Sequence, residues 1–415
     1  MTDIEVHIDL DQQSHRVGTL RRTPRRGGET VVFEYHPDWL DNPARFSLEP
    51  ALAIGPGPFV PAAGLGFFGS IGDSAPDTWG RRLMQRAERR RADRETRPPH
   101  ALAEADYLLG VSDVSRLGAL RFLEAGQDEF QAPAGAGIPS LIELGRLLGV
   151  TDRIFRDEET DEDLQLIFAP GSSLGGARPK ASVIDQHGHL AIAKFPKETD
   201  DYSVERWETI ALDLARVAGI RIPHHELRQV AGRDVLLSRR FDREGDRRIP
   251  FLSALSMMGL KDGERGSYPE LVDVLTQHGA QARDDAAELY RRMTFNLLVS
   301  NVDDHLRNHG FLWRGPGGWI LSPAYDLNPT PADLKPRILT TSIHVGEGAG
   351  DVDAVLDVAE FFALGAEAAR MIVREVGQAV RRWSVVAEAR GAGPSEIRRM
   401  QSAFEHADLE RALAL

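Results

Sequence analysis

Cysteine is absent from the 415-residue chain. Its absence excludes thiol nucleophiles, disulfide bonds and zinc sites built on cysteine. No run of eighteen apolar residues occurs either, so the sequence predicts no membrane-spanning helix. The first residues, MTDIEVHIDLDQQ, have neither the basic start nor the apolar block of a signal peptide. We therefore expect a cytoplasmic protein without a membrane partner.

Lysine is scarce, because arginine supplies all but five of the 50 basic residues. A position that keeps lysine in such a chain indicates a need for its compact ammonium group. The net charge of -13 argues against a protein that coats DNA or RNA. We interpret the one strongly basic run, residues 81–97, as a solvated helix face rather than a nucleic-acid patch.

The length and composition are those of a globular protein with two or three domains, with 42% hydrophobic and 27% charged residues. Strand-like runs separated by Gly/Pro turns fill residues 1–70. A helix follows, with Asp77 as its N-cap, and 117–126 resembles a closing strand. The Pro/Gly/Ala-rich stretch 127–140 predicts a linker. We place a β-rich N-terminal subdomain at 1–126.

A second domain is predicted over 140–250. It starts with a helix and continues with a glycine-rich loop, a hairpin whose turn is DQHG, an amphipathic helix and two more strands. From 251 to 415 the pattern is helical, apart from one hairpin around RGPGG. The expected fold class is α+β, with a mixed lobe followed by an all-helical lobe.

Two features of the mixed lobe point to phosphate binding. Glycines at 171, 175 and 176 allow backbone N–H groups to approach a phosphate closely. Lys194 lies in the apolar strand LAIAKFP, where a lysine is costly unless it is paired or bound to a ligand. The next helix carries Glu208. A strand lysine paired with a helix glutamate is the arrangement with which protein kinases hold ATP phosphates.

The stretch LVSNVDDHLRNHGFL, residues 298–312, carries unusually many polar groups between two apolar segments. Asp303 and Asn308 have the spacing D-x-x-x-x-N, in which the aspartate accepts a hydroxyl proton and the asparagine binds Mg²⁺. Asp326 follows after the hairpin, in YDLNP. Mg²⁺ prefers one or two carboxylates with phosphate and water oxygens, so Asn308 and Asp326 suit it.

Zinc is the alternative for this stretch, because His305 and His309 have the i, i+4 spacing of a metalloprotease helix. The sequence between them, HLRNH, lacks the glutamate that would serve as the general base. The flanking residues do not resemble a helix. We favour the magnesium interpretation.

The same motifs resemble the HipA family of toxin kinases from bacterial toxin–antitoxin modules. The similarity spans nearly the whole chain and includes GDSAPDTWGRRLMQRA, GVSDVSRLGALRF, SSLGGARPKASV, AIAKFP, RRFDR, SNVDDHLRNHGFL and SPAYDLNPTP. It implies a bilobal protein-kinase-like fold, with a mixed N-lobe and a helical C-lobe, behind an N-terminal β-rich subdomain.

The resemblance also implies roles for individual residues. Asp303 would be the catalytic base, and His305 would lie near the γ-phosphate. ATP would contact the groups Gly175, Gly176, Lys180, Lys194, Glu208, Phe241 and Asp242, with RRFDR as the interlobe hinge. Arg239 stands where some members carry an acidic residue. Ser173, or alternatively its neighbour Ser172, would be the autophosphorylated serine.

The resemblance therefore predicts an ATP- and Mg²⁺-dependent serine/threonine protein kinase. Its partners would be a helix-turn-helix antitoxin and a protein substrate, expected to be an aminoacyl-tRNA synthetase. Operator DNA would be contacted only through the antitoxin, because no helix-turn-helix is evident in this chain. Two alternatives stay open, namely a small-molecule or lipid kinase and a non-catalytic nucleotide-binding co-repressor.

Overall fold

The computed structural model describes residues 3–25, 28–131, 137–168, 176–346 and 350–415. The chain forms two compact units of mixed α and β structure. The first unit comprises Met1–Thr199 and Arg228–Lys261, and the second unit comprises Asp200–Leu227 and Asp262–Leu415. These units group the residues differently from the three domains predicted over 1–126, 140–250 and 251–415, whose boundaries stay predictions.

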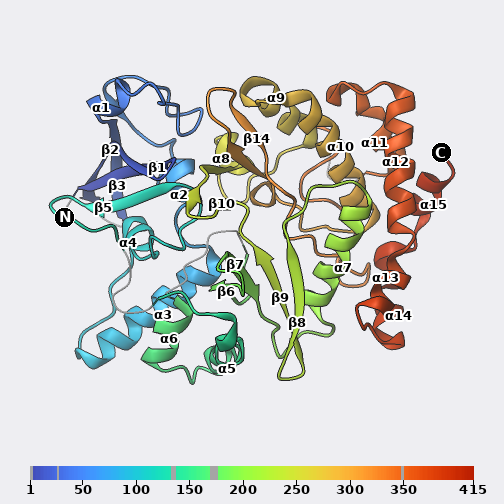
Figure 1. Ribbon diagram of the computed structural model, residues 1–415, viewed down its shortest axis with the longest axis horizontal. Coiled ribbons are helices and arrows are strands. Elements are labelled where there is room, and N and C mark those ends of the chain that lie inside the picture. Colours follow the sequence, from blue (N-terminus) through green and yellow to red (C-terminus); the bar gives the residue numbers. More distant parts are fainter. Residues whose placement is uncertain (1–2, 26–27, 132–136, 169–175, 347–349) are drawn as a thin grey trace. The chain divides into compact units, whose positions relative to one another are not determined.

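The first unit begins with an antiparallel sheet of strand order β4-β3-β2-β1-β5, drawn in blue to cyan in Figure 1. Buried and partly exposed residues alternate along β1, as expected for a sheet with one face on the core. Asp11 and Gln12 both have positive φ, 51° and 65°, which is the geometry of a two-residue type I′ hairpin. The strands are β1 (Ile4–Leu10), β2 (Gln13–Arg25), β3 (Gly28–Tyr35), β4 (Pro58–Phe59) and β5 (Leu120–Glu124).

The helix predicted after Asp77 is confirmed as α3 (Thr78–Arg94), and the Asp77 side chain caps it by accepting a hydrogen bond from Gly80 N at 2.9 Å. The predicted closing strand is confirmed as β5, which pairs with β1. Three shorter helices complete this part of the unit: α1 (Pro37–Leu40), α2 (Gly69–Gly72) and α4 (Glu104–Leu109).

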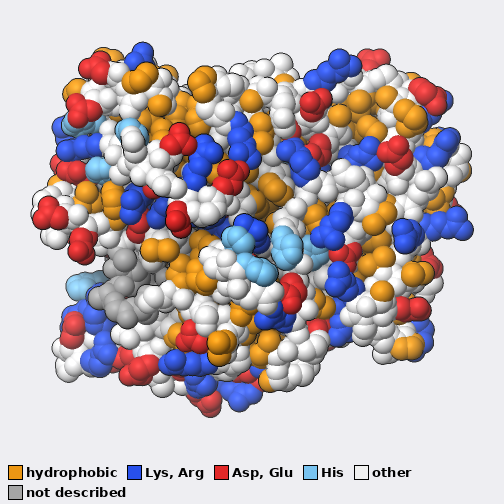
Figure 2. All heavy atoms as spheres, viewed as in Figure 1, with side chains coloured by type: hydrophobic (Ala, Val, Ile, Leu, Met, Phe, Trp, Pro, Cys, Tyr) orange, Lys and Arg blue, Asp and Glu red, His pale blue; other side chains and the backbone are white. Residues whose placement is uncertain are grey.

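The arginines of the basic run are largely neutralised by acidic neighbours. Arg81 forms a bidentate pair with Glu104 at 2.7 Å, and Arg90 pairs with Asp161 at 2.7 Å. Figure 2 shows basic and acidic side chains interspersed over the visible face of the molecule. The pairing favours the predicted solvated helix face. The other pairs are Arg86 with Asp157 and Glu159, Arg91 and Arg97 with Glu88, and Arg94 with Asp161.

The rest of the first unit is built on a sheet of order β6-β7-β9-β8. The predicted hairpin is confirmed, since β6 and β7 pair antiparallel and Gly188 N donates to Asp185 O across the turn. Sequence reasoning did not predict α6. The elements are η1 (Leu141–Glu143), α5 (Leu144–Phe155), α6 (Asp161–Phe168), β6 (Lys180–Ile184), β7 (Leu190–Lys194), β8 (His225–Val230), β9 (Arg233–Arg239), β10 (Arg243–Glu244), β11 (Arg247–Arg248), β12 (Phe251–Ser253) and α8 (Ala254–Met257).

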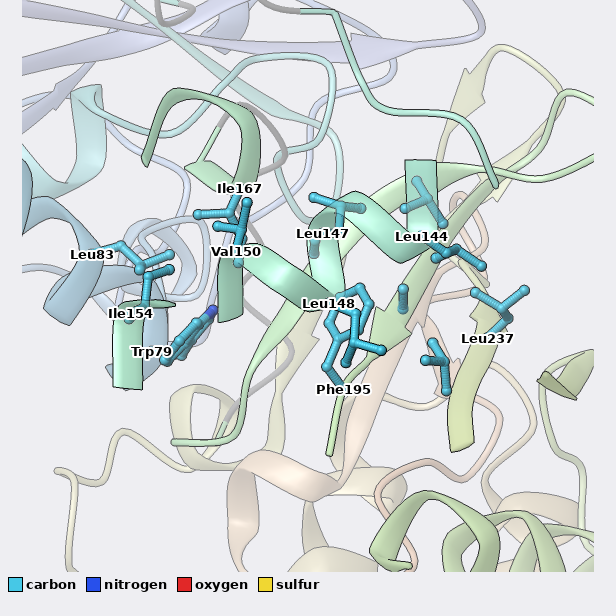
Figure 3. Close-up of a cluster of buried hydrophobic side chains, with 14 of the residues drawn as sticks. Trp79, Leu83, Leu144, Leu147, Leu148, Val150, Ile154, Ile167, Phe195 and Leu237 are labelled. Carbon is cyan, nitrogen blue, oxygen red and sulfur yellow. The ribbon is translucent and has the colours of Figure 1, made fainter. Parts of the chain in front are cut away.

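One hydrophobic cluster joins α3 to this second sheet (Figure 3). Trp79 and Leu83 of α3 belong to one buried cluster with Leu147 of α5, with Phe195 just after β7 and with Leu237 of β9. The Trp79 indole N–H also donates to Lys180 O at 3.1 Å. The helix that follows the N-terminal sheet therefore supplies core residues to the glycine-loop lobe.

The second unit is mainly helical, but its bounds differ from 251–415, so the all-helical lobe predicted there stays a prediction. The predicted hairpin is confirmed as β13 (Gly310–Trp313) and β14 (Trp319–Leu321), which pair antiparallel. No helix within the described ranges combines the length and apolar character needed to cross a bilayer. The helices are α7 (Val204–Val217), α9 (Tyr268–His278), α10 (Ala282–Leu298), η2 (Leu306–Asn308), α11 (Val352–Asp357), η3 (Ala359–Phe362), α12 (Ala366–Val380), α13 (Trp383–Ala389), α14 (Pro394–Phe404) and α15 (Ala407–Leu413).

Candidate functional site

The polar stretch noted in the sequence forms the loop between α10 and β13, with one 3₁₀ turn, η2, inside it. Ser300 directs the chain out of α10 through a left-handed conformation with φ 54°. Its hydroxyl donates to Ala403 O at 2.7 Å, and Thr340 Oγ1 donates to Val302 O at 2.8 Å. The loop is therefore fixed on both sides by the helical unit, as a rigid platform requires.

Asp303 presents its carboxylate to solvent from this loop, with a side chain 60% exposed. Its backbone oxygen is held, because it accepts from His305 N at 2.9 Å and from Asn308 Nδ2 at 3.1 Å. The Lys335 ammonium lies 3.7 Å from its carboxylate. An exposed carboxylate on a fixed backbone can accept a proton from an incoming hydroxyl.

Asn308 and His305 each have a buried side-chain atom without a hydrogen-bond partner in the described part of the chain. These atoms are Asn308 Oδ1 and His305 Nδ1. Because the Asn308 amide nitrogen donates to Asp303 O, its amide oxygen is turned the other way. A buried carbonyl oxygen without a donor is costly, which favours a site that a ligand completes.

Asp304 and His309, to which the sequence assigned no role, are buried in the unit. His309 Nε2 lies 2.7 Å from Asp304 Oδ1, although the alignment is not that of a hydrogen bond. Tyr268 OH donates to Asp304 Oδ2. Burial, with the Asp304 charge beside the phenol, raises the pKa of Tyr268 well above its ordinary value. Tyr268 is therefore a permanent hydrogen-bond donor to Asp304.

The zinc interpretation finds no support here. His309 faces Asp304 and stacks edge-on against Tyr268, with 5.5 Å between the ring centroids. Within the described ranges there is no group of three or more His, Asp or Glu side chains placed to hold a metal. Zinc sites in proteins normally use three or four such ligands.

Asp326 has a left-handed backbone conformation with φ 59°, which is uncommon outside glycine and often marks functional sites. Hydrogen bonds hold the segment around it against the loop. Tyr325 OH donates to Arg307 O at 2.7 Å, and Asn328 N donates to Asn301 Oδ1 at 3.1 Å. The structure thus brings the Asp326 segment beside the loop that carries Asn308.

This donor set fits magnesium. Asn308 offers a buried amide oxygen to which no described residue donates, and Asp326 offers a carboxylate that also accepts from Asn328 Nδ2 at 3.1 Å. Hard oxygen ligands in small number are what Mg²⁺ requires, because it keeps several waters and phosphate oxygens. A site of this kind would not need the third protein ligand that zinc demands.

Two of the predicted nucleotide residues of the first unit, Lys180 and Lys194, lie on β6 and β7. Lys194 and Lys180 occupy directly opposite register positions, so their side chains share one face of the sheet. Lys180 Nζ is buried and lies 2.7 Å from Asp77 Oδ2. Gly176 has φ 103°, a conformation that favours glycine. Gly175, Ser172 and Ser173 lie outside the described residues.

Glu208 is buried on α7. It belongs to the second unit, whereas Lys194 belongs to the first, so their pairing stays a prediction.

The predicted hinge contains a buried ionic network. Asp242 is fully buried and accepts from Arg240 Nε at 2.6 Å, from Arg243 Nη1 at 2.7 Å and from Gly118 N at 2.7 Å. Burial alone would raise the pKa of Asp242, but the two guanidinium groups outweigh it and hold that pKa well below its ordinary value. Phe241 is half-buried, with its ring 6.2 Å from that of Phe251. The contacts of Phe241 and Asp242 with a nucleotide stay predictions.

Sequence reasoning missed several residues that shape the site: Tyr268, Asn296, Asn301, Asn328 and Lys335. Asn301 and Asn328 lie inside the two motifs but had no assigned role. Tyr268 had no signal at all, because it meets Asp304 only through a contact 36 residues away in the sequence.

Comparison with known proteins identifies the family. The HipA-like C-terminal domain matches residues 172–383, slightly more than half of the chain, and the HipA N-terminal domain matches residues 8–104. The chain belongs to the HipA family. The predicted resemblance is confirmed.

Two relatives of the chain carry a kinase description. The chain is 26% identical over 347 residues to "Putative kinase Y4mE" of Sinorhizobium fredii, covering 76% of each protein. A protein of Haemophilus influenzae with the same kinase description is 24% identical over 196 residues, covering 41% of this chain and 57% of that protein.

Among solved structures, the HipA of Shewanella oneidensis, in a complex with HipB and operator DNA, has a TM-score of 0.67. The two chains are 16% identical, and the match covers 99% of this chain and 96% of that one. The match shows that the two chains share a fold.

Proposed function

We propose that this chain is an ATP- and Mg²⁺-dependent serine/threonine protein kinase, the toxin of a HipA-type toxin–antitoxin module. The observation that carries the proposal is the arrangement in the second unit. An exposed Asp303, an Asn308 amide oxygen that accepts no hydrogen bond within the described ranges and a left-handed Asp326 are held together on two hydrogen-bonded segments. The kinase descriptions of the relatives support the same reaction class.

In this proposal Asp303 accepts the proton of the substrate hydroxyl as the phosphoryl group is transferred. Asn308 Oδ1 and the Asp326 carboxylate hold Mg²⁺, which when bound neutralises charge on the ATP phosphates. His305 lies near the γ-phosphate. Lys194 contacts the ATP phosphates and pairs with Glu208, while Gly175, Gly176 and Lys180 line the phosphate loop.

The adenine lies at the segment with Phe241. In the same proposal, Asp242 acts on the nucleotide by fixing the backbone of this segment, because its own carboxylate is occupied by arginines.

The phosphate acceptors are proposed as well. We place autophosphorylation at Ser173 or its neighbour Ser172, and we propose an aminoacyl-tRNA synthetase as the cellular substrate. A HipB-like helix-turn-helix antitoxin is the proposed partner, since the Shewanella HipA is found with HipB and operator DNA. Contact with operator DNA would then run through the antitoxin.

A phosphoryl-transfer assay tests the proposal. Purified chain with radiolabelled ATP and Mg²⁺ should label itself, and mass spectrometry of residues 171–183 should locate the phosphate on one of the two serines. Asp303→Asn should lower the rate by about 10²–10⁴-fold, as expected when a general base is lost. Asp353→Asn, a matched change at an exposed carboxylate on α11, should leave the rate unchanged.

Calorimetry tests the metal assignment separately. Asp326→Ala should abolish the Mg²⁺-dependent part of ADP binding, and unchanged affinity would remove Asp326 from the metal site. Label found in a small molecule or lipid, with none in protein, would point to the first alternative. Nucleotide binding without any transfer would point to the non-catalytic co-repressor.

A further inference from the structure

A continuous series of hydrogen bonds runs through the second unit behind the proposed metal site. It links two carboxylates, Asp304 and Asp326, through four intervening polar side chains. We call this series the amide relay. Its members, in order, are Asp304, Tyr268, Asn296, Asn301, Asn328 and Asp326.

The first half of the amide relay starts at Asp304. Tyr268 OH donates to Asp304 Oδ2, and the same phenol oxygen accepts from Asn296 Nδ2 at 2.9 Å. Tyr268, Asn296 and Asp304 are each at most 3% exposed. The Asp304 backbone oxygen is fixed as well, because it accepts from Thr341 N at 2.9 Å. The side chains of this half therefore have almost no contact with bulk water.

The second half reaches Asp326. Asn301 Nδ2 donates to Asn296 Oδ1 at 3.1 Å, and Asn301 Oδ1 accepts from Asn328 N at 3.1 Å. The Asn328 side chain then donates to Asp326 Oδ1 at 3.1 Å and to Asp326 O at 3.2 Å. Two bonds therefore hold the residue whose backbone has the strained left-handed conformation.

The direction of donation explains the residue types. From Asn328 N to Asp304, every group donates toward Asp304 and accepts from the other side. Asn296 and Asn301 must each donate and accept at once, which an amide can do and an ionised carboxylate cannot. Hydrogen bonds in a buried series strengthen one another, so the bonded atoms of the amide relay hold each other in place.

The amide relay also borders Asn308. A small cavity of about 10 Å³ has Asn296, Asn301 and Asp304 of the relay in its lining, together with Asn308, His309 and several apolar side chains. Such a volume holds about one water molecule. The amide relay thus reaches both proposed metal ligands. Asn328 is hydrogen-bonded to Asp326, and Asn296, Asn301 and Asp304 line the same cavity as Asn308.

We propose that the amide relay is a positioning device that sets the separation between Asp326 and Asn308 for a divalent cation. Tyr268, Asn301 and Asn328 are then positioning residues for the reaction, although none of them touches the metal. This inference rests on the proposed function, because it concerns the same site. Groups that orient metal ligands typically change metal affinity by about 10–100-fold when they are lost.

Two buried tyrosines of the second unit provide a matched test. Tyr268 OH belongs to the amide relay, whereas Tyr290 OH donates to Val355 O at 2.9 Å, outside it. Both residues are fully buried, so Tyr268→Phe and Tyr290→Phe remove the same atom from similar surroundings. Only Tyr268→Phe should weaken the Mg²⁺-dependent binding of ADP, by about 10-fold.

The measurement is calorimetry of the full-length chain with ADP, at a series of MgCl₂ concentrations and in EDTA. Tyr268→Phe should shift the half-saturating Mg²⁺ concentration upward while leaving ADP binding in EDTA unchanged. Asn301→Asp, which keeps the shape but removes the donor to Asn296, should shift it in the same direction. Equal Mg²⁺ dependence in Tyr268→Phe, Tyr290→Phe and the unmodified chain would overturn the inference.

The result separates the two proposals. If the unmodified chain binds ADP with Mg²⁺ but transfers no phosphate, the kinase proposal fails, and the tyrosine pair still decides the role of the amide relay. If the unmodified chain shows no Mg²⁺-dependent binding at all, both proposals fail. A Tyr268→Phe protein that unfolds is replaced in the test by Asn301→Asp, for which the same two outcomes apply.

Discussion

The two units contain buried polar systems of opposite character. In the first unit, Asp242 is surrounded by the guanidinium groups of Arg240 and Arg243 and holds an irregular turn by charge. In the second unit, the amide relay carries charge only at its two ends and holds its segments by aligned amides and one phenol. Attraction between opposite charges is strong but depends only weakly on orientation. Amide hydrogen bonds are weaker, but they specify which atom donates and which accepts.

The energies of the two systems differ accordingly. Removing one partner of a buried ion pair leaves an uncompensated charge in a medium that solvates it poorly, which costs about 3–5 kcal/mol. Removing one neutral hydrogen-bond partner costs about 1–3 kcal/mol. We therefore expect the ionic system to govern stability and the amide relay to govern geometry.

The largest effect should come from breaking the ionic network. Asp242→Asn removes the carboxylate that Arg240 contacts directly and should lower the free energy of unfolding by about 3–5 kcal/mol, measured by urea denaturation. Asp246→Asn, an exposed residue of the same turn, is the control and should change little. A loss below about 1 kcal/mol for Asp242→Asn would show that the turn is held by other contacts.

Mild acid should weaken the second unit before it weakens the ionic network. His406 Nδ1 accepts from Leu409 N at 3.3 Å, and Nε2 lies 3.1 Å from Leu298 O, so the folded unit requires the neutral ring. Burial, aided by Arg337, lowers the pKa of His406 to about 4. In the unfolded chain the pKa of His406 is about 6.5. Between about pH 6.5 and 4 the ring therefore binds a proton in the unfolded chain but not in the folded one.

The stability that depends on neutral His406 is therefore complete above about pH 6.5 and falls as the pH drops toward 4, by up to about 3 kcal/mol. Asp242, with its lowered pKa, stays charged across this range. His406→Asn keeps an N-cap for α15 without a titrating ring, so its stability should depend less on pH between 7 and 4.5. Parallel pH profiles for both proteins would contradict the assignment.

Loss of the relay phenol should have an intermediate effect. Tyr268→Phe leaves both Asp304 Oδ2 and Asn296 Nδ2 without their shared partner and should cost about 1–3 kcal/mol in thermal or urea unfolding. Tyr290→Phe leaves only one backbone carbonyl without its donor, so its cost should be smaller. A reversed order would contradict the view that the Tyr268 hydroxyl joins two buried polar groups of the amide relay.

The smallest change in the free energy of unfolding should come from breaking an exposed ion pair. Arg411 and Asp353 lie 2.8 Å apart, with side chains 49% and 62% exposed. Arg411→Gln should change the free energy of unfolding by less than about 1 kcal/mol, because water and salt screen the pair. A change as large as that of Asp242→Asn would contradict the view that burial, rather than charge alone, produces the large effect.

The sequence predicted the elements well, because hydrophobic periodicity and turn residues are local signals. The cap at Asp77, the hairpin around RGPGG and the order of Lys194, Asp303, Asn308 and Asp326 could all be read from short windows. The spacing D-x-x-x-x-N selected two of the residues that the structure places on one loop.

The remaining features depend on contacts between distant parts of the chain. Lys180 was predicted as a contact of ATP, and its buried pairing with Asp77, 103 positions away, had no local signal. Asp242 was predicted as a nucleotide contact, yet only the fold shows that its carboxylate also holds Gly118. The amide relay depends on which amide atom faces which neighbour, and composition does not encode that choice.

The shared core around Trp79 has a practical consequence for dividing this protein. A fragment that began after the predicted linker would carry the glycine-loop sheet but lack Trp79 and Leu83, which are 4% and 2% exposed in the whole chain. The sheet of this fragment would expose an apolar surface to water, and exposed apolar surfaces cause protein molecules to associate. We expect residues 137–415 expressed alone to aggregate, and to become soluble when the segment that carries α3 is supplied as a separate peptide.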